Sequence, residues 1–196
     1  MMTLYKYTSI EKFHQIIDVI LHDRLYAATL EQLNDPFEGN FIHQVGRSAN
    51  IENKTIDSQG DEYRICSLTT NKDNNLMWSH YANMHQGVVL EVKVSDFYKV
   101  HDMKYSGYRN MYISEKLSED EMVEVLTHKE EHWSYEDEKR VILKNEKYIN
   151  IKLLKIYLGA KVDENKKELL KKLVQKLGKD IEVQEYQPMT IIRTTY

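Results

Sequence analysis

Residues 63–94, YRICSLTTNKDNNLMWSHYANMHQGVVLEVKV, decide the fold. Tyr63–Thr69 is rich in β-branched and aromatic residues, which predicts a strand. Residues 72–84 follow with the spacing of a short helix. Gly87–Val94 is apolar at most positions, which is typical of a central strand buried on both faces. The stretch therefore predicts a strand, a short helix and a second strand.

The remaining sequence continues this alternation of strands and helices without repeats. Ser9 is a good N-cap for a first helix, and Ser118 begins a capping box with Glu121. We expect further strands at 4–8, 24–29, 100–105, 133–143, 153–158, 181–186 and 189–194, and helices from Ile10, over 118–130 and in the Lys-rich segment 166–179. The sum predicts an α+β fold, with a mixed or antiparallel central sheet and flanking helices, in one domain spanning 1–196.

Two connecting segments stand out by composition. Residues 34–39 read NDPFEG, a turn cluster in which Pro36 ends any helix begun at Leu30. Residues 46–61 are polar and poor in apolar side chains, so we expect a mobile loop that serves as a lid.

Composition places the chain among ordinary globular proteins, with 41% hydrophobic and 30% charged residues in 196. A net charge of −4 supplies no global attraction to nucleic acid. The single cysteine, Cys66, excludes an intrachain disulfide and a multi-cysteine zinc site. No apolar run is long enough to cross a bilayer, and the N-terminus lacks a signal-peptide hydrophobic region. We therefore expect a cytoplasmic protein that does not associate with membranes.

The helix within 63–94 is unusually dense in functional side chains. Its segment LMWSHYANMHQG carries Trp78, His80, Tyr81 and His85 within twelve residues. Such side chains have polar atoms that need partners when buried, so they indicate either a binding site or a satisfied core. His80 and His85 are five residues apart and point to different faces of a helix, and no known metal motif supplies further ligands, so we expect no metal site.

Residues 136–140, EDEKR, form the second constellation. Along a strand Glu136, Glu138 and Arg140 would share one face, with Trp133 and Tyr135 on the opposite, structural face. Two adjacent carboxylates raise one pKa unless a cation compensates, an arrangement suited to general-base or ribose-binding work. The alternative is an exposed strand face with an ion pair.

The third constellation is Ser67-Leu68-Thr69, whose two hydroxyls project from one side of a strand. It indicates either a binding edge or an ordinary strand. We also predict that Trp78, His80, Tyr81, Asn34, Asp35 and Glu138 line one common pocket.

Five motifs in one order resemble the bacterial domain of unknown function 2971, from residue 4 to about residue 159. The motifs are Tyr5-Lys6-Tyr7, Asn34-Asp35-Pro36-Phe37-Glu38, Ser67-Leu68-Thr69, Met77-Trp78-Ser79-His80-Tyr81 with His85 and Gly87, and Trp133-Ser134-Tyr135-Glu136-Asp137-Glu138-Lys139-Arg140. That family is named for lacking an assigned function.

A basic residue on the first strand, a Ser-x-Thr strand and a later Glu-x-Glu strand are similar to the arginine–serine–glutamate plan of ADP-ribosyltransferases. The resemblance implies an ADP-ribosyltransferase-like fold with NAD as substrate. It implies that Lys6 meets the NAD phosphates, Ser67 supports the nicotinamide site and Glu138 assists transfer at the ribose. Lys6 departs from the usual arginine and lacks its bidentate fork.

The resulting site hypothesis has three groups. The catalytic set is Glu138, Glu136 and His80; the cofactor-binding set is Lys6, Ser67, Thr69, Tyr81 and Trp78; the remaining pocket residues are Asn34, Asp35, Glu38, His85 and Arg140.

The favoured function is NAD-dependent transfer of ADP-ribose to a macromolecular acceptor, protein or nucleic acid, by a toxin or phage-defence effector. One alternative is a metal-dependent or metal-independent nuclease or other hydrolase that uses His80, His85, Asp35 and Glu38. The other is a non-enzymatic ligand-binding or partner subunit encoded in a bacterial defence or toxin–antitoxin operon.

Overall fold

The computed structural model describes residues 2–45, 50–56, 58–106, 110–111 and 117–187. The residues of the chain group into two compact units, each defined by the contacts among its own residues. The first comprises Met1–Arg24, Thr69–Val94 and Ile151–Tyr196, and the second comprises Leu25–Leu68 and Ser95–Asn150. Both units combine helices with mostly antiparallel strands, so the α+β fold with a mixed sheet is confirmed, while the single domain stays a prediction.

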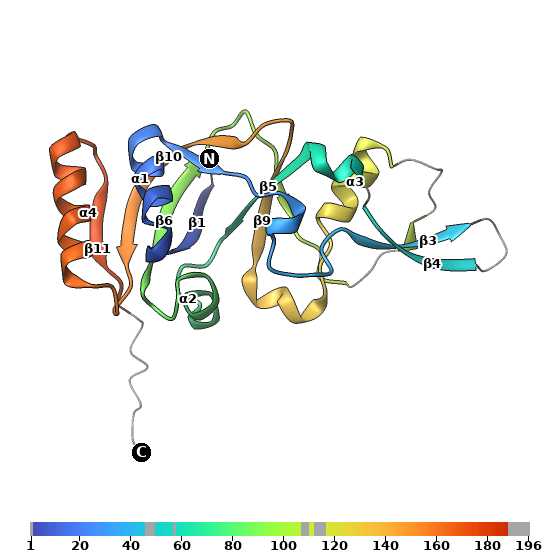
Figure 1. The fold of residues 1–196 in the computed structure, drawn as a ribbon, viewed down its shortest axis with the longest axis horizontal. Coiled ribbons are helices and arrows are strands. Elements are labelled where there is room, and N and C mark those ends of the chain that lie inside the picture. The colour runs from blue at the N-terminus through green and yellow to red at the C-terminus, as the bar shows by residue number, and fades with distance from the viewer. Residues whose placement is uncertain (1, 46–49, 57, 107–109, 112–116, 188–196) are drawn as a thin grey trace, which may run out of the picture. The chain divides into compact units, whose positions relative to one another are not determined.

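The first unit is built on strands in the order β11-β10-β6-β1 (Figure 1). β1 and β6 pair antiparallel from Thr3↔Lys93 to Ser9↔Gly87, β10 runs antiparallel to β6, and β11 is parallel to β10. Successive residues of β6 are buried on both faces, as its continuous apolar sequence predicts. The strands are β1 (Thr3–Ser9), β6 (Gly87–Val94), β10 (Tyr148–Leu158) and β11 (Glu182–Glu185).

Three α-helices complete the first unit: α1 (Phe13–His22) after the 3-10 helix η1 (Ile10–Lys12), α2 (Asn75–Tyr81) and α4 (Glu164–Leu177). The expected cap is present, because the Ser9 hydroxyl accepts a hydrogen bond from the Glu11 amide. In the Lys-rich helix α4, Leu170 and Val174 are buried. Lys167 is buried too, and it binds Glu164 and Glu185, which ties α4 to the neighbouring β11 (Figure 1).

A left-handed turn ends α2 earlier than the predicted boundary at residue 84. Asn83, Met84 and His85 have φ angles of 46°, 51° and 68°. The chain then enters β6 at Gly87, where a Cβ atom would lie 2.3 Å from the Thr8 carbonyl oxygen. Close backbone approach, which only glycine permits, therefore fixes this corner.

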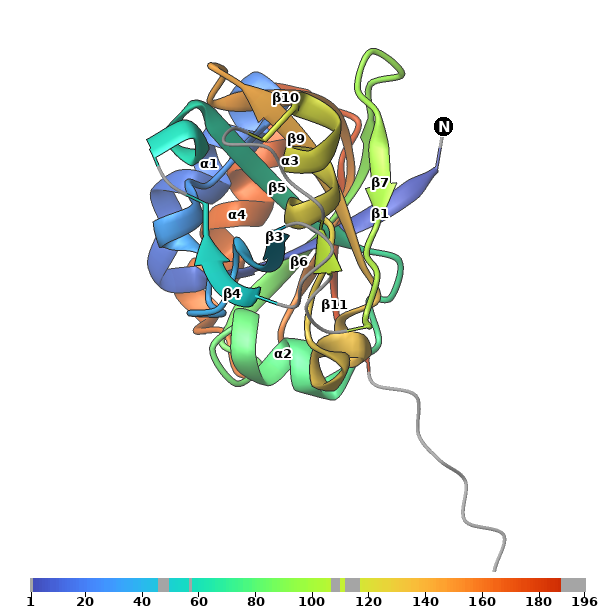
Figure 2. The same cartoon turned by 90° about the vertical axis from the view of Figure 1, so that its right-hand side faces the viewer.

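The second unit has strands in the order β5-β9-β7 and a small sheet in the order β4-β3-β8. Helix α3 (Glu119–Leu126) begins at the predicted capping box and packs Met122 and Leu126 against Tyr63 and Ile65 of β5 (Figure 2). The strands are β2 (Arg24–Tyr26), β3 (Asn40–Val45), β4 (Asn50–Thr55), β5 (Tyr63–Thr69), β7 (Val100–Asp102), β8 (Asn110–Met111) and β9 (Glu138–Lys144). The 3-10 helices are η2 (Leu30–Gln32), η3 (Ser58–Glu62) and η4 (Glu131–Glu136).

Two sequence predictions for this unit are wrong. Much of the segment 46–61 is regular structure, because β4 pairs antiparallel with β3 and η3 follows it. The strand expected over 133–143 begins only at Glu138. Residues before it form η4, which ends where the Asp137 amide bonds to the Ser134 carbonyl and Asp137 adopts a φ of 42°. A left-handed residue interrupts strand alternation, so the parity argument fails across it.

Two other predicted strands are shorter than expected, and a third cannot be compared. The segment 24–29 contributes only β2 and an isolated bridge at Ala28, and 100–105 contributes β7 and a bridge at Lys104. The strand predicted at 189–194 lies outside the described residues. Among the residues that are described, no helix is long and apolar enough to cross a membrane.

The corner between β6 and β10 gives a test of the fold. A Cβ atom at Gly159 would lie 2.2 Å from the His85 carbonyl oxygen and 2.8 Å from that of Gly87, whereas one at Gly178 meets nothing within 4 Å. We expect Gly159→Ala to lower the free energy of unfolding by about 3 kcal/mol. Gly178→Ala, at a φ of 61°, should cost about 1 kcal/mol. Urea unfolding would measure both, and equal losses would contradict the close approach.

Candidate functional site

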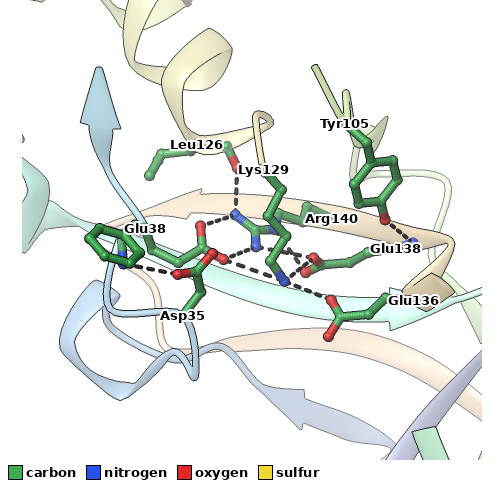
Figure 3. A network of polar contacts seen from close by, with 9 residues as sticks. Asp35, Glu38, Tyr105, Leu126, Lys129, Glu136, Glu138 and Arg140 are labelled. Carbon is green, nitrogen blue, oxygen red and sulfur yellow. Dashed lines mark hydrogen bonds and ion pairs between the residues drawn. The ribbon is translucent and has the colours of Figure 1, made fainter. Parts of the chain in front are cut away.

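Five charged side chains of the second unit form one buried cluster, here called the charge network (Figure 3). Glu136, Glu138 and Arg140 are 2%, 4% and 0% exposed. The side chains of Glu38 and Lys129 are 3% and 6% exposed. Three carboxylates therefore share two cations in a space without bulk water.

Arg140 is the centre of the charge network. Its Nε donates to Glu138 Oε1 at 2.8 Å and its Nη2 to Glu138 Oε2 at 3.1 Å. Both terminal nitrogens also donate to Glu38, and Nη1 donates to the Leu126 carbonyl at 2.7 Å. These bonds use all five N–H donors of the guanidinium group. Arg140 is therefore buried without an unsatisfied hydrogen-bond donor.

Lys129 provides the second cation. Its Nζ donates to Glu136 at 2.6 Å and to Glu138 at 3.0 Å, and it lies 3.6 Å from Glu38. It also sits 5.0 Å from the centroid of the Trp133 ring. Burial lowers the pKa of Lys129, but the charges of these carboxylates outweigh burial and raise it above its ordinary value. Lys129 is therefore protonated at neutral pH, and its positive charge is balanced by the carboxylates around it.

Glu138 is held from several sides. Burial raises its pKa, yet Arg140 and Lys129 outweigh burial and lower it to about 2. The Ser67 hydroxyl adds a hydrogen bond to the carboxylate that acts in the same direction. The Glu138 amide donates to the Tyr105 hydroxyl at 2.7 Å, and the pKa of Tyr105 rises to about 12, chiefly through burial. Glu138 is consequently an oriented, ionised carboxylate at neutral pH.

Local sequence explains how these groups meet. Residues 138 and 140 alternate on β9 and so share one face. The turn NDPFEG supplies Glu38: Asp35 Oδ1 accepts from the Phe37 amide at 2.9 Å, and Gly39 takes a φ of 77°. Lys129 follows the C-terminus of α3, whose Leu126 carbonyl is free of an intrahelical partner and accepts from Arg140.

A pocket adjoins the charge network through Glu38 and Lys129. Its empty volume is about 270 Å³, including the part open to solvent. It is lined by Asp35, Phe37, Glu38, Asn40, His128, Lys129 and Glu130. Because Lys129 is surrounded by carboxylates on its buried side, the pocket presents an acidic wall beside one aromatic ring.

The second unit brings together six of the predicted site residues: Asp35, Glu38, Ser67, Glu136, Glu138 and Arg140. Asn34, also predicted, is exposed beside Asp35 and does not line the pocket. The alternative of an exposed strand face for Glu136, Glu138 and Arg140 is wrong, since all three are buried. Glu136 joins them from η4 rather than from the strand.

The other predicted site residues lie in the first unit: Lys6 and Thr69 on strands, and Trp78, His80, Tyr81 and His85 in α2 and the turn after it. Trp78 is fully buried, donates from Nε1 to the Lys72 carbonyl at 2.9 Å, and stacks on His85 with ring centroids 5.2 Å apart. These contacts are those of a satisfied core residue.

His80 is exposed and Tyr81 half-buried. Thr69 is buried, and its hydroxyl accepts from the Asn71 amide. Burial, together with Lys161, lowers the pKa of His85. The cofactor-binding and catalytic roles of these residues, and the pocket common to both units, stay predictions.

Sequence reasoning missed Lys129, Tyr105 and His128. Nothing in the run THKEEHW distinguishes the buried Lys129 from a surface lysine. The strand face that the sequence assigned to Trp133 and Tyr135, opposite Glu136, is wrong, because residues 131–136 form η4. Trp133 is half-buried. Its indole Nε1 has no hydrogen-bond partner among the described residues.

The charge network resembles a cation site whose cation is a side chain. Three carboxylates converge on the Lys129 ammonium. Within the described part of the chain, no group of three or more His, Cys, Asp or Glu side chains has the geometry to hold a metal.

Titration of Glu138 tests this electrostatic arrangement. Its native pKa of about 2 lies below the ordinary 4.5, so the unfolded chain binds the proton first as pH falls. Ionisation of Glu138 should therefore contribute fully to the free energy of unfolding above pH 4.5, and about 3 kcal/mol of this contribution should be lost as pH falls to about 2. Carboxyl-carbon NMR of the folded protein, with Glu138→Gln identifying the resonance, would measure the midpoint. A midpoint near 4.5 would contradict the network.

Comparison of the chain with protein-family models, with curated proteins and with solved structures finds no match.

Proposed function

We propose that the protein transfers ADP-ribose from NAD, with Glu138 acting at the ribose. One observation carries this proposal: the Ser67 hydroxyl hydrogen-bonds the Glu138 carboxylate from the neighbouring strand β5. This pair is the serine–glutamate part of the arginine–serine–glutamate plan that the sequence resembles. An ADP-ribosyltransferase-like fold, membership of the domain of unknown function 2971 family and a defence or toxin role belong to the same proposal.

The chemistry fits an ionised carboxylate held in one orientation. Cleavage of the nicotinamide–ribose bond develops positive charge at the ribose, and a preorganised carboxylate stabilises that charge. With a pKa of about 2, Glu138 carries its negative charge at neutral pH. Ser67 would fix which oxygen faces the ribose.

Access to Glu138 requires one side chain to move. Glu138 is 4% exposed, and Lys129 lies between it and the pocket. Lys129 has a second, shorter bond to Glu136, at 2.6 Å. In the proposed complex Lys129 stays with Glu136, and Glu138 Oε2 turns from Lys129 to the ribose. Glu136 thereby serves the reaction by holding Lys129.

The remaining roles rest on the resemblance alone. Lys6 would meet the NAD phosphates, while Thr69, Trp78 and Tyr81 would contact the nicotinamide end and His80 the acceptor. The acceptor would be a protein or a nucleic acid.

A non-enzymatic binding subunit is the second candidate. The observation in its favour is that both oxygens of Glu138 are already bonded, to Arg140 and Lys129, and closed from solvent. A sealed carboxylate of this kind is typical of a structural ion network.

NAD binding and turnover separate the two candidates. We expect calorimetry to show NAD binding, and Glu138→Gln to leave affinity nearly unchanged while lowering nicotinamide release by about 10²–10³-fold, because the charge it stabilises develops only in the transition state. Ser67→Ala, which keeps the buried charges, should lower release by a smaller factor. Cell lysate supplies the acceptor.

Glu168→Gln on the exposed face of α4 is the matched control and should change neither quantity. Unfolding curves of each variant establish that it is folded. No NAD binding by the unmodified protein at millimolar concentration removes the transferase. NAD binding without nicotinamide release by any variant favours the binding subunit.

A further inference from the structure

The pocket of the second unit contains a buried carboxylate without a cation. Asp35 lines the pocket and is 6% exposed. Its Oδ1 accepts from the Phe37 amide, and within the described residues its side chain has no ion-pair partner. Glu38, by contrast, is paired with both Arg140 and Lys129. The second Asp35 oxygen has no hydrogen-bond or ion-pair partner among the described residues, so it is available to a ligand in the pocket.

The surrounding charges favour a cation as that ligand. Asp35, Glu38 and Glu130 line the pocket, and Glu136 and Glu138 lie behind Lys129. Among the described residues, the cations that contact this group of carboxylates are Lys129 and Arg140, which leaves an excess of three negative charges. An anionic group placed beside Asp35 would be repelled, because the one ammonium in the wall is already shared by three carboxylates.

An aromatic ring completes the wall. Phe37 lines the pocket with 55% of its surface exposed, and a cation near such a ring is attracted by its π-electrons. The Phe37 backbone amide donates a hydrogen bond to Asp35 Oδ1, and this bond keeps the residue that carries the ring next to the carboxylate.

We propose that this pocket binds an alkylammonium group, as carried by a lysine side chain or a polyamine. An ammonium is a compact point charge, whereas a guanidinium prefers both oxygens of one carboxylate. Asp35 offers one oxygen only, since the other holds the Phe37 amide. The inference does not depend on NAD chemistry.

Amide NMR of the whole protein tests the proposal, with spermidine, N-acetyl-lysine amide, N-acetyl-arginine amide and acetate as probes. We expect the two alkylammonium probes to shift the Phe37 and Asn40 amides with millimolar affinity that weakens with salt. The relative affinity of spermidine and the lysine derivative distinguishes a free polyamine from a protein side chain as the source.

Asp35→Asn keeps an oxygen for the Phe37 amide and removes the charge, so affinity should fall about tenfold. Asp163→Asn is the matched control, because Asp163 also accepts backbone amide hydrogens, at the N-terminus of α4 in the first unit, and it should leave affinity unchanged. Unfolding curves show that both variants fold. Absent shifts, tighter binding of the arginine derivative or of acetate, or undiminished binding by Asp35→Asn would overturn the proposal.

Discussion

The buried guanidinium of Arg140 is the constraint on which the second unit depends. It is fully buried, so each of its donors needs an acceptor inside the protein. Those acceptors are Glu38, Glu138 and the Leu126 carbonyl, which belong to the NDPFEG turn, β9 and the end of α3. One side chain thus joins the NDPFEG turn, whose Glu38 is 102 residues away in the sequence, to β9 and the end of α3.

The other members of the charge network partly offset one another's charges. Two carboxylates on Arg140 leave excess negative charge, which Lys129 offsets, and Lys129 in turn holds Glu136 at the end of η4. Removing Arg140 or Lys129 would leave buried carboxylates without their cation, at a cost of about 3–5 kcal/mol. Burying all of them adds little net stability, so the network specifies geometry more than it stabilises the fold.

Much of the secondary structure was predictable because its causes are local. Apolar patterning gives β5 and β6 the bounds that the sequence predicts, and the capping box at Ser118 marks the start of α3. The failures occur where a single backbone conformation overrides the pattern. Asp137 in the left-handed region separates η4 from β9, and the left-handed turn after α2 shortens that helix.

The candidate site was predictable only in part. Motif clustering selected Glu38, Glu136, Glu138 and Arg140, but no sequence pattern reveals that Glu38 and Arg140 pair across 102 residues. Lys129 and Tyr105 were missed for the same reason, since tertiary contacts alone distinguish them from surface residues. Trp78 is the opposite case: its motif in the sequence indicated a site, whereas its contacts in the structure are those of a core residue of the first unit.

A double-mutant cycle between Glu38 and Arg140 tests the central claim most directly. Urea unfolding of Glu38→Gln, Arg140→Met and the double variant should give a coupling free energy of about 2 kcal/mol or more, because each single substitution breaks the buried Glu38–Arg140 ion pair and the double variant loses it only once. The exposed pair Lys144 and Glu119, treated in the same way, should couple by less than about 1 kcal/mol. Additive losses at Glu38 and Arg140 would contradict the account.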